Sequence, residues 1–281
     1  MSFMGASVPR LTIITATHNA AGELPGLIES IREQTYKNLQ WIVVDGASTD
    51  GTVGLLESAG DTTLGAWRSE PDRGIYDAWN KGLQWADGEW FLFLGADDRL
   101  AGRDILEQVV GSLVGLPESI CWAYGQVRQF GAKGQSQVLG EPWTKAKASF
   151  RSVMSLPHQG IFHRRALFDR CGRFDPGFRI AGDYALLLKA VQQGLEPVFL
   201  PMLVTHIGGG GLSSRQASAS LALRENVAAR RTLGLRPLYP PRWCWDYLKS
   251  QVKRAISHLA GESVLRRLVN LYRRATGRTA V

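Results

Sequence analysis

The chain has 281 residues, 44% of them hydrophobic, and a formal net charge of +8, which predicts a globular protein with one large domain and a hydrophobic core. Its three cysteines lie far apart in the sequence, which argues against a disulfide framework or a zinc site and fits a reducing cytoplasm. No segment has the apolar run of a signal peptide or of a spanning helix, which needs roughly 18 to 20 residues, so we expect a cytoplasmic protein.

Apolar runs of strand length alternate with helical patterns in the first 113 residues. This alternation is typical of an α/β sheet with crossover helices. We predict strands at 11–17, 39–45, 63–69 and 89–94, and helices at 24–34, 49–57, 75–86 and 104–113.

Regularity weakens after the helix at 104–113. We expect a loop-rich stretch to about Pro157. The helical period then returns in ALFDRC, at 166–171, and in 183–194, where Gly194 ends the helix. A last strand is predicted at 197–203.

Polar side chains follow three of the predicted strands. They are Thr15, Thr17 and Asn19 after the first, Asp45 after the second, and Asp97 and Asp98 after the fourth. Parallel α/β sheets bind ligands beyond the carboxyl ends of their strands, so these side chains predict a ligand site. For Asp45 alone, which Gly46 and Ser48 follow, a carboxylate that caps a helix is an equal explanation.

Two adjacent carboxylates end the run WFLFLGADDRL. Like charges side by side repel, so Asp97 and Asp98 stay ionised together only when a cation or several donors hold them. Carboxylates suit Mg²⁺ or Mn²⁺, and such an ion binds diphosphates. The first turn, ATHNAAGEL, has neither G-x-G-x-x-G nor G-x-x-x-x-G-K-[ST], so neither a dinucleotide enzyme nor a phosphate-binding-loop enzyme is predicted.

The segments TIITATHNA, IVVDGASTDGT, DRGIYDAWNKG and GADD occur in this order. Together they resemble the family 2 glycosyltransferases of GT-A fold, over about residues 10 to 210. The resemblance implies a Rossmann-like, mostly parallel sheet with flanking helices, and Mn²⁺ or Mg²⁺ as cofactor. It also implies inverting transfer of a hexosyl or N-acetylhexosaminyl group from a nucleoside-diphosphate sugar, with UDP favoured, in bacterial polysaccharide biosynthesis.

The resemblance also implies roles for the donor side of the site. It places Thr15, Thr17, Asn19 and Asp45 near the nucleoside, Asp72 and Arg73 in the donor pocket, and Asp97 and Asp98 at the metal and the ribose diphosphate. The family's acidic motif commonly reads D-x-D-D, and here Gly95 occupies its first position. A ribose contact by that first carboxylate is therefore not carried over, and which of Asp97 and Asp98 binds the metal directly is left open.

One general base is sufficient for inverting transfer, because a metal-bound diphosphate already leaves readily. Asp183 opens a helix just after Gly182, and it resembles the family's acidic residue at the start of a late helix, which serves as base. The other explanation is an ordinary helix cap.

Further site residues are predicted toward the carboxyl end of the same domain. His158 and Gln159 resemble a segment on the acceptor side, although a hydrogen-bonded structural histidine is the alternative. His206 precedes four glycines in a loop that is expected to close over the donor. His206 is a candidate metal ligand and Arg215 a candidate diphosphate ligand, and a solvated loop is the alternative for both.

The chain changes character toward its end, so we divide it into a glycosyltransferase domain, 1–212, and a helical extension, 213–281. Residues 242–281 hold nine basic and two acidic side chains and thus a net +7. Aromatic and aliphatic residues recur there on one helical face, which suits an anionic membrane surface. The alternative is a pair of helices packed on the domain, and no nucleic-acid motif accompanies the charge.

These patterns together predict a metal-dependent inverting glycosyltransferase. Its acceptor is a saccharide or a lipid-linked saccharide, and its place is the cytoplasm, peripheral to the inner face of the membrane. Two alternatives are a non-catalytic nucleotide-sugar or glycan-binding module of the same fold and a membrane-associated interaction protein. Fold does not fix the substrate, so donor sugar, acceptor and linkage stay open.

Overall fold

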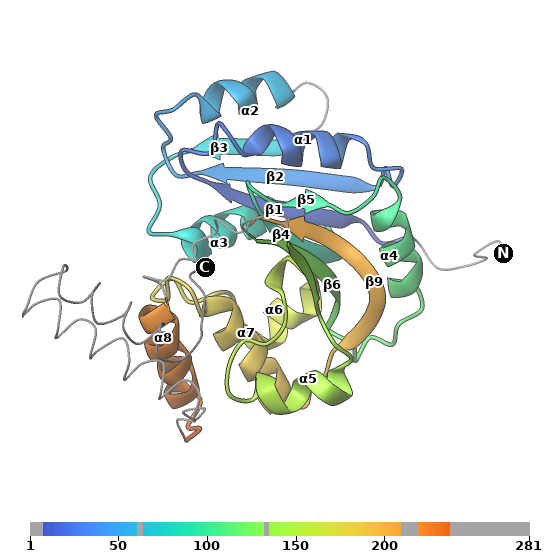
Figure 1. Cartoon of the computed structure of the whole chain (residues 1–281), viewed down its shortest axis with the longest axis vertical. Coiled ribbons are helices and arrows are strands. Elements are labelled where there is room, and N and C mark those ends of the chain that lie inside the picture. The colour runs from blue at the N-terminus through green and yellow to red at the C-terminus, as the bar shows by residue number, and fades with distance from the viewer. Residues whose placement is uncertain (1–7, 61–63, 132–134, 209–218, 237–281) are drawn as a thin grey trace, which may run out of the picture. The chain divides into compact units, whose positions relative to one another are not determined.

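The structure is a computed structural model, and it describes residues 8–60, 64–131, 135–208 and 219–236 (Figure 1). These residues belong to one compact unit that extends to Arg236. Within the described part, no helix is long and apolar enough to cross a membrane.

One sheet of nine strands forms the centre of this unit, in the order β3-β2-β1-β4-β8-β6-β9-β5, with β7 paired to β6. Its first half is parallel: β1 pairs with β2 and β4, and β2 pairs with β3. These strands are β1 (Leu11–Thr17), β2 (Leu39–Asp45), β3 (Ala66–Ser69) and β4 (Trp90–Gly95).

The second half of the sheet is mixed. Strands β6 and β9 are parallel, whereas β4 with β8, β6 with β8, β6 with β7, and β5 with β9 are antiparallel. Their bounds are β5 (Arg99–Leu100), β6 (Trp122–Phe130), β7 (Ser136–Leu139), β8 (Ile161–Arg164) and β9 (Val198–Ile207). The predicted α/β sheet with flanking helices is confirmed.

Helices cover both faces of the sheet, as Figure 1 shows. One face packs against α1 (Leu24–Arg32), α2 (Thr52–Gly60) and α4 (Ile105–Leu113). The other packs against α3 (Ile75–Trp85), α5 (Trp143–Phe150), α6 (Arg165–Cys171) and α7 (Gly182–Gln192). Helix α8 (Ala219–Thr232) packs in turn against α7.

The strand sequences explain this double cover. In β1, Ile13 is buried against the helices α1, α2 and α4, whereas its neighbour Ile14 is buried on the opposite face. A strand that is buried on both sides reads as a continuous apolar run, which is the pattern of LTIITAT. The strands and helices predicted between 11 and 113 are confirmed, with ends that differ by a few residues.

The stretch from 114 to 157 differs most from the structure that we predicted from the sequence. We expected loops there, but it contains β6, β7 and α5. Polar residues and Gly125 interrupt the apolar pattern of β6. The glycine is needed because a Cβ at 125 would lie 2.4 Å from Cγ2 of Val204 on β9. The last strand is also longer than the predicted 197–203, since β9 continues to Ile207.

The predicted boundary between residues 212 and 213 stays a prediction. Helix α8 lies within the predicted extension, and it packs against α7 through side chains of the same hydrophobic core. The basic segment 242–281 lies outside the described residues.

Candidate active site

The three polar strand ends lie side by side. In the register of the sheet Thr17 is opposite Asp45, and Ala16, one residue before Thr17, is opposite Gly95. Strands β2, β1 and β4 therefore end at the same level. Thr17 and Asp45 thus lie at the same edge of the sheet as the end of β4.

Asp45 is a fully buried carboxylate with four donors. Oδ1 accepts from the hydroxyls of Thr17 and Ser48, and Oδ2 accepts from the Ser48 backbone N–H and the Ser69 hydroxyl. Burial raises the pKa of Asp45, but the bonds from Ser48, Ser69 and Thr17 outweigh it and hold the pKa below its ordinary value. Asp45 is thus ionised and shapes the loop after β2.

Hydrogen bonds join the loop after β1 to the loop after β2. The Asn19 N–H donates to the Ser48 hydroxyl at 2.7 Å, and the Thr49 N–H donates to Oδ1 of Asn19 at 2.9 Å. Asn19 and Ala47 have φ of 50° and 60°. An asparagine tolerates this left-handed conformation better than most residues, which explains its place at the turn.

Thr15 lies elsewhere. Its side chain is fully buried, and its hydroxyl accepts a hydrogen bond from the Trp41 indole at 3.1 Å. The structure thus places Thr15 in the core, while Thr17 and Asp45 are the last residues of β1 and β2 and Asn19 lies in the loop after β1.

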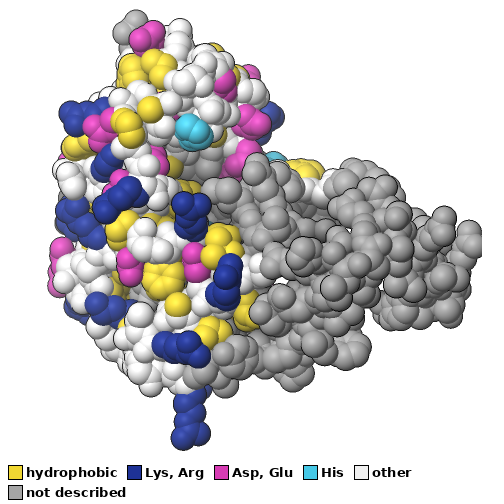
Figure 2. Space-filling view, turned by 90° about the vertical axis from the view of Figure 1, so that its left-hand side faces the viewer, with side chains coloured by type: hydrophobic (Ala, Val, Ile, Leu, Met, Phe, Trp, Pro, Cys, Tyr) yellow, Lys and Arg dark blue, Asp and Glu magenta, His cyan; other side chains and the backbone are white. Residues whose placement is uncertain are grey.

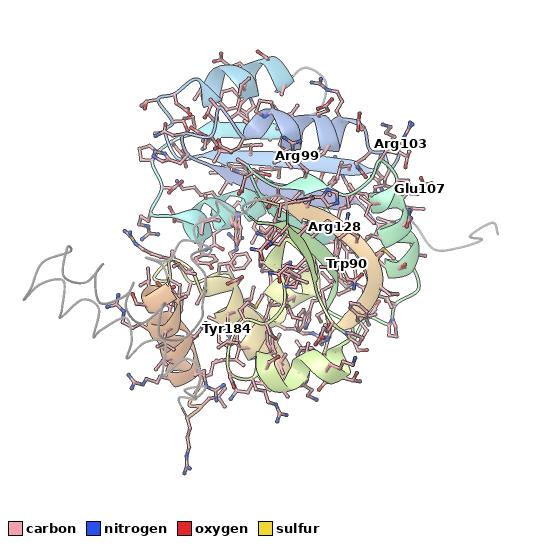
Figure 3. All side chains as sticks on the ribbon, viewed as in Figure 1. Trp90, Arg99, Arg103, Glu107, Arg128 and Tyr184 are labelled. Carbon is pink, nitrogen blue, oxygen red and sulfur yellow. The ribbon has the colours of Figure 1, made fainter. Side chains whose placement is uncertain are left out.

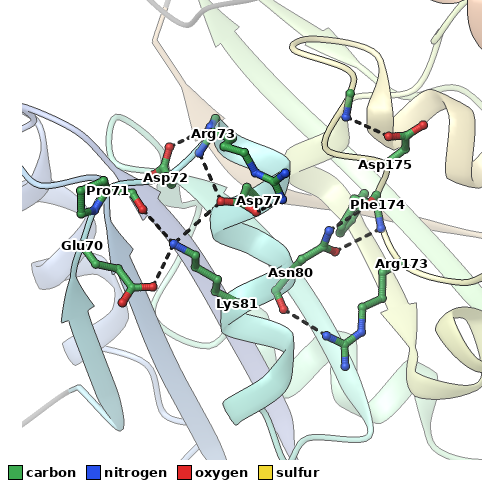
Figure 4. A network of polar contacts seen from close by, with 12 residues as sticks. Glu70, Pro71, Asp72, Arg73, Asp77, Asn80, Lys81, Arg173, Phe174 and Asp175 are labelled. Atoms are coloured by element: carbon green, nitrogen blue, oxygen red, sulfur yellow. Dashed lines mark hydrogen bonds and ion pairs between the residues drawn. The ribbon is translucent and has the colours of Figure 1, made fainter.

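Asp72 lies beside the loop after β2. A Cβ on Gly46 would be 2.7 Å from Oδ2 of Asp72, so the two loops meet where residue 46 is a glycine. Oδ1 of Asp72 accepts from the Gly74 N–H at 2.8 Å. Arg73 is largely exposed, and its guanidinium pairs with Asp77 at 3.1 Å, as Figure 4 shows.

The same network fixes helix α3 to its surroundings (Figure 4). Lys81 pairs with Glu70 at 2.8 Å and donates to the carbonyl of Pro71 at 3.0 Å. On the far side of α3, the Asn80 side chain makes hydrogen bonds with both the N–H and the carbonyl of Phe174. Helix α3 therefore connects the loop after β3 with the segment that leads to α7.

The adjacent carboxylates at the end of β4 differ in environment. Asp98 is 1% exposed, and its Oδ2 accepts from the Gly95 N–H at 2.6 Å. Burial, and then the charge of Asp97, raise the pKa of Asp98 well above its ordinary value. A Cβ on Gly95 would lie 2.9 Å from Oδ1 of Asp97, so Asp97 occupies the space next to this glycine.

A hard divalent cation fits this pair. Mg²⁺ and Mn²⁺ are commonly bound by one or two protein carboxylates together with the phosphates of a substrate. A cation bound at this pair would offset both the burial of Asp98 and the repulsion between the two carboxylates, which raise the pKa of Asp98. Across the described segments, no three His, Cys, Asp or Glu side chains are close enough together to hold a metal without a substrate.

His206 lies on β9, opposite Arg99 of β5 and next to Arg128 of β6; Figure 3 labels both arginines. Its ring packs edge-on against Phe130 with centroids 5.5 Å apart, and its Nε2 has no hydrogen-bond partner among the residues that the structure describes. Burial and Arg128 lower the pKa of His206, which favours the neutral form that binds metals. Arg215 lies outside the described residues.

Asp183 lies in the first turn of α7 and is 8% exposed. Its Oδ1 accepts from the Tyr76 hydroxyl at 3.1 Å and from the Tyr184 N–H at 2.8 Å. Its Oδ2 lies 3.2 Å from Nδ1 of His158. The amino end of a helix also stabilises a carboxylate through the helix dipole.

His158 and Gln159 belong to the short 3₁₀ turn 158–160, which contacts β4 and β9. The His158 ring stacks on Trp79 with centroids 4.7 Å apart. The Gln159 carbonyl accepts from the Thr205 hydroxyl at 3.1 Å. The structure therefore brings His158 next to Asp183.

Tyr76 is the contact of Asp183 that we did not predict. At the start of α3 Tyr76 is buried, whereas its neighbour Ile75 is half-buried. A Cβ on Gly182 would lie 2.8 Å from the Tyr76 ring, so the tyrosine lies against α7 where only glycine leaves room. The glycine before Asp183 was the sequence signal for this close approach.

Comparison with known proteins adds to this geometry. The profile of Glycosyl transferase family 2 matches residues 12–161. An uncharacterized glycosyltransferase of Mycobacterium tuberculosis is 33% identical over 216 residues, which are 76% of this chain and 80% of that protein. A PGL/p-HBAD biosynthesis glycosyltransferase of Mycobacterium bovis is 28% identical over 89% of this chain and 97% of its own length.

Two solved structures support the fold. A mannosyltransferase from Pyrobaculum calidifontis in complex with GDP-Man and Mn²⁺ has a TM-score of 0.62 and 21% identity, over 98% of this chain and 77% of its own. A fragment of S. aureus TarS in complex with UDP-GlcNAc has a TM-score of 0.59 and 18% identity, over 78% and 66% of the two chains.

Proposed function

Because this chain belongs to the family 2 glycosyltransferases, we propose that it transfers a hexosyl or N-acetylhexosaminyl group with inversion from a nucleoside-diphosphate sugar. The acceptor is a saccharide or a lipid-linked saccharide of a cell-surface polysaccharide or glycan. Donor binding depends on Mn²⁺ or Mg²⁺.

One observation carries this proposal. The carboxylate pair Asp97 and Asp98 lies at the edge of the sheet where β1 and β2 end with Thr17 and Asp45. One member of the pair, Asp98, is buried and has a raised pKa. A bound Mn²⁺ or Mg²⁺ would neutralise both this pair and the diphosphate of the donor. Asp97 is the more exposed of the two carboxylates, and its Oδ2 lies near Gly208.

Asp183 is the proposed general base. It takes the proton of an acceptor hydroxyl while that oxygen forms a bond to the anomeric carbon of the sugar. The bond from the anomeric carbon to the diphosphate oxygen breaks, and the diphosphate keeps the electron pair. Tyr76 and His158 orient the Asp183 carboxylate by contacting one oxygen each.

The donor loops are proposed from position and chemistry. Thr17, Asn19 and Asp45 line the joined loops after β1 and β2, with Asp72 beside them. We favour UDP as the nucleotide, and the complexes of similar folds with UDP-GlcNAc and GDP-Man name the alternatives to test first.

We also place the protein at the inner face of the membrane through residues 242–281. The net +7 of that segment comes from the sequence. By contrast, on the face drawn in Figure 2 the described Lys and Arg side chains are dispersed among acidic and hydrophobic ones. Membrane contact at the basic segment would bring the enzyme to a lipid-linked acceptor.

The test is donor turnover across UDP-, GDP- and dTDP-sugars with Mn²⁺, Mg²⁺ or EDTA. We expect metal-dependent release of one nucleoside diphosphate, lost in Asp97→Asn. The control is Asp87→Asn, an exposed carboxylate that pairs with Arg10 just before β4 begins. If no donor binds with metal, the assignment of Asp97 and Asp98 is wrong; binding without turnover on any acceptor would indicate a binding module.

A further inference from the structure

Helix α8 places a second acidic side chain next to α7. Glu225 is 9% exposed, and its carboxylate accepts three backbone hydrogen bonds from consecutive residues that end two positions before Asp183. We propose that Glu225 is a positioning residue, which fixes the backbone from which the base Asp183 projects. This inference rests on the proposed function.

The three bonds are short and come from one stretch of chain. Oε1 accepts from the Arg179 N–H at 2.9 Å, and Oε2 accepts from the Ile180 and Ala181 N–H groups at 2.8 and 2.9 Å. The first N–H groups of a helix have no partner within it. At α7 the capping position is Ala181, which has no side-chain acceptor. Glu225, from another helix, accepts the Ala181 N–H at this capping position and the Arg179 and Ile180 N–H groups of the turn just before it.

Tyr76 holds the same peptide segment from the opposite direction. Its hydroxyl donates to the carbonyl of Ile180 at 2.6 Å and also reaches Oδ1 of Asp183. The Ile180 N–H is bound to Glu225 and the Ile180 carbonyl to Tyr76, so both polar groups of this residue are fixed. These hydrogen bonds hold the segment that enters α7, and they therefore fix the backbone position from which the Asp183 side chain projects.

Helix α8 is itself fastened to the domain. Arg230, one and a half turns after Glu225, is buried and donates to the carbonyls of Arg151, which follows α5, and Arg236. Ala229 and Val227 are buried as well. Because Glu225 projects from an anchored helix, a change in its bonds moves the start of α7 rather than α8.

The chemistry explains why a carboxylate is required. Its two oxygens accept all three N–H groups, whereas the amide of a glutamine has one acceptor oxygen and presents N–H groups to the other donor. In Glu225→Gln, at least one buried backbone N–H would thus face the amide NH₂ group, which is also a donor, and that N–H would lose its hydrogen bond. A displacement of about 1 Å in a reacting group lowers a rate by about 100-fold.

The experiment compares wild type, Glu225→Gln, Glu225→Asp and Glu107→Gln. Glu107 is the matched control, because it is an exposed glutamate on α4 whose carboxylate accepts one hydrogen bond, from Thr35. We expect kcat per folded molecule to fall about 10- to 100-fold in Glu225→Gln, with the donor KM unchanged. Glu225→Asp keeps the charge but is shorter, so its kcat should fall less.

Amide hydrogen exchange provides a readout that does not depend on turnover. Exchange at residues 179–181 should accelerate in Glu225→Gln and be unchanged in Glu107→Gln. If amide exchange accelerated in folded Glu225→Gln but its kcat were unchanged, Glu225 would have a structural role only, and the proposal would be overturned. If Glu225→Gln does not fold, the same two measurements on Glu225→Asp decide. No turnover by wild type would contradict the proposed function instead.

Discussion

Both carboxylate oxygens of Asp183 contact a side chain: Oδ1 contacts the Tyr76 hydroxyl, and Oδ2 contacts Nδ1 of His158. If it is the base, Asp183→Asn removes proton acceptance but keeps the size of the side chain. We expect kcat to fall by about 100- to 10,000-fold, the usual contribution of a general base. Donor binding, measured by calorimetry with Mn²⁺ and nucleoside diphosphate, should be unchanged.

The control for this variant is Asp175→Asn. Asp175 is exposed in the loop before α7, and its carboxylate accepts from the Gly177 N–H. Its replacement should leave kcat within about two-fold of wild type, as expected for a surface substitution. Full activity in Asp183→Asn would show that the carboxylate only caps α7.

His163 makes stability depend on pH. It is fully buried among aromatic rings, and within the described part of the chain neither ring nitrogen forms a hydrogen bond of good geometry. Burial, and then the neighbouring His158, lower the pKa of His163 well below its ordinary value. The unfolded chain therefore takes up a proton near pH 6.5 that the folded chain does not, and the free energy of unfolding falls as the pH drops below about 6.5.

The loss from this one group approaches about 1.4 kcal/mol per pH unit. Urea unfolding at pH 5, 6, 7 and 8 measures it for wild type and for His163→Phe, which fills the same aromatic site without a titrating group. The slope between pH 5 and 6.5 should be smaller in the variant. Equal slopes in the two proteins would assign the acid sensitivity to other residues.

At the same residue scale, part of the site was readable from sequence. The strand-end positions of Thr17, Asp45 and Asp97 follow from the apolar runs before them. By contrast, Tyr76 and Asp183 are 107 positions apart, and Glu225 lies 44 to 46 positions from the N–H groups that it binds. Such contacts arise only when α3, α7 and α8 pack together, and no local pattern specifies them.

At the scale of elements, helix α3 approaches β1 closely at Gly82. A Cβ there would lie 2.6 Å from Cγ2 of Ile14, a stiff β-branched side chain. Gly82→Ala should gain helix propensity of about 1 kcal/mol, but overpacking costs about 1 to 3 kcal/mol. We expect a net loss of stability of up to about 2 kcal/mol, measured by urea unfolding.

Gly54→Ala is the matched substitution. Gly54 lies in α2, and no atom lies within 4 Å of the Cβ that it would gain. The alanine should therefore stabilise the protein by up to about 1 kcal/mol through helix propensity alone. If Gly82→Ala stabilised the protein as much as Gly54→Ala does, α3 would have room to shift away from β1.

Elements with a regular period were predictable, and those fixed by distant partners were not. The strands 11–17 and 39–45 were predicted with the bounds of β1 and β2, because buried parallel strands are uninterrupted apolar runs. In β6, polar residues and Gly125 interrupt the period that would have marked the strand, and the register with β9 shifts on both sides of Gln126, with the extra residues on β9. β5 is two residues long and exists because it pairs with β9.

At the scale of the whole molecule, the chain divides its charge unevenly. Nine basic and two acidic side chains fall in 242–281, so the rest of the chain is close to neutral. An anionic membrane attracts each basic residue near its surface by about 1 kcal/mol. The membrane affinity that we propose should therefore reside in this segment and weaken as salt is added.

Flotation with vesicles tests this division. The full chain should float with vesicles of phosphatidylcholine and phosphatidylglycerol but not with phosphatidylcholine alone, and a chain of residues 1–236, which ends with the described unit, should not float. Replacing Arg266, Arg267, Arg273 and Arg274 by glutamine removes about 4 kcal/mol of attraction, close to a 1,000-fold loss of affinity. If the 1–236 chain floated, the membrane contact would have to lie within residues 1–236, because that chain contains no residue of the basic segment.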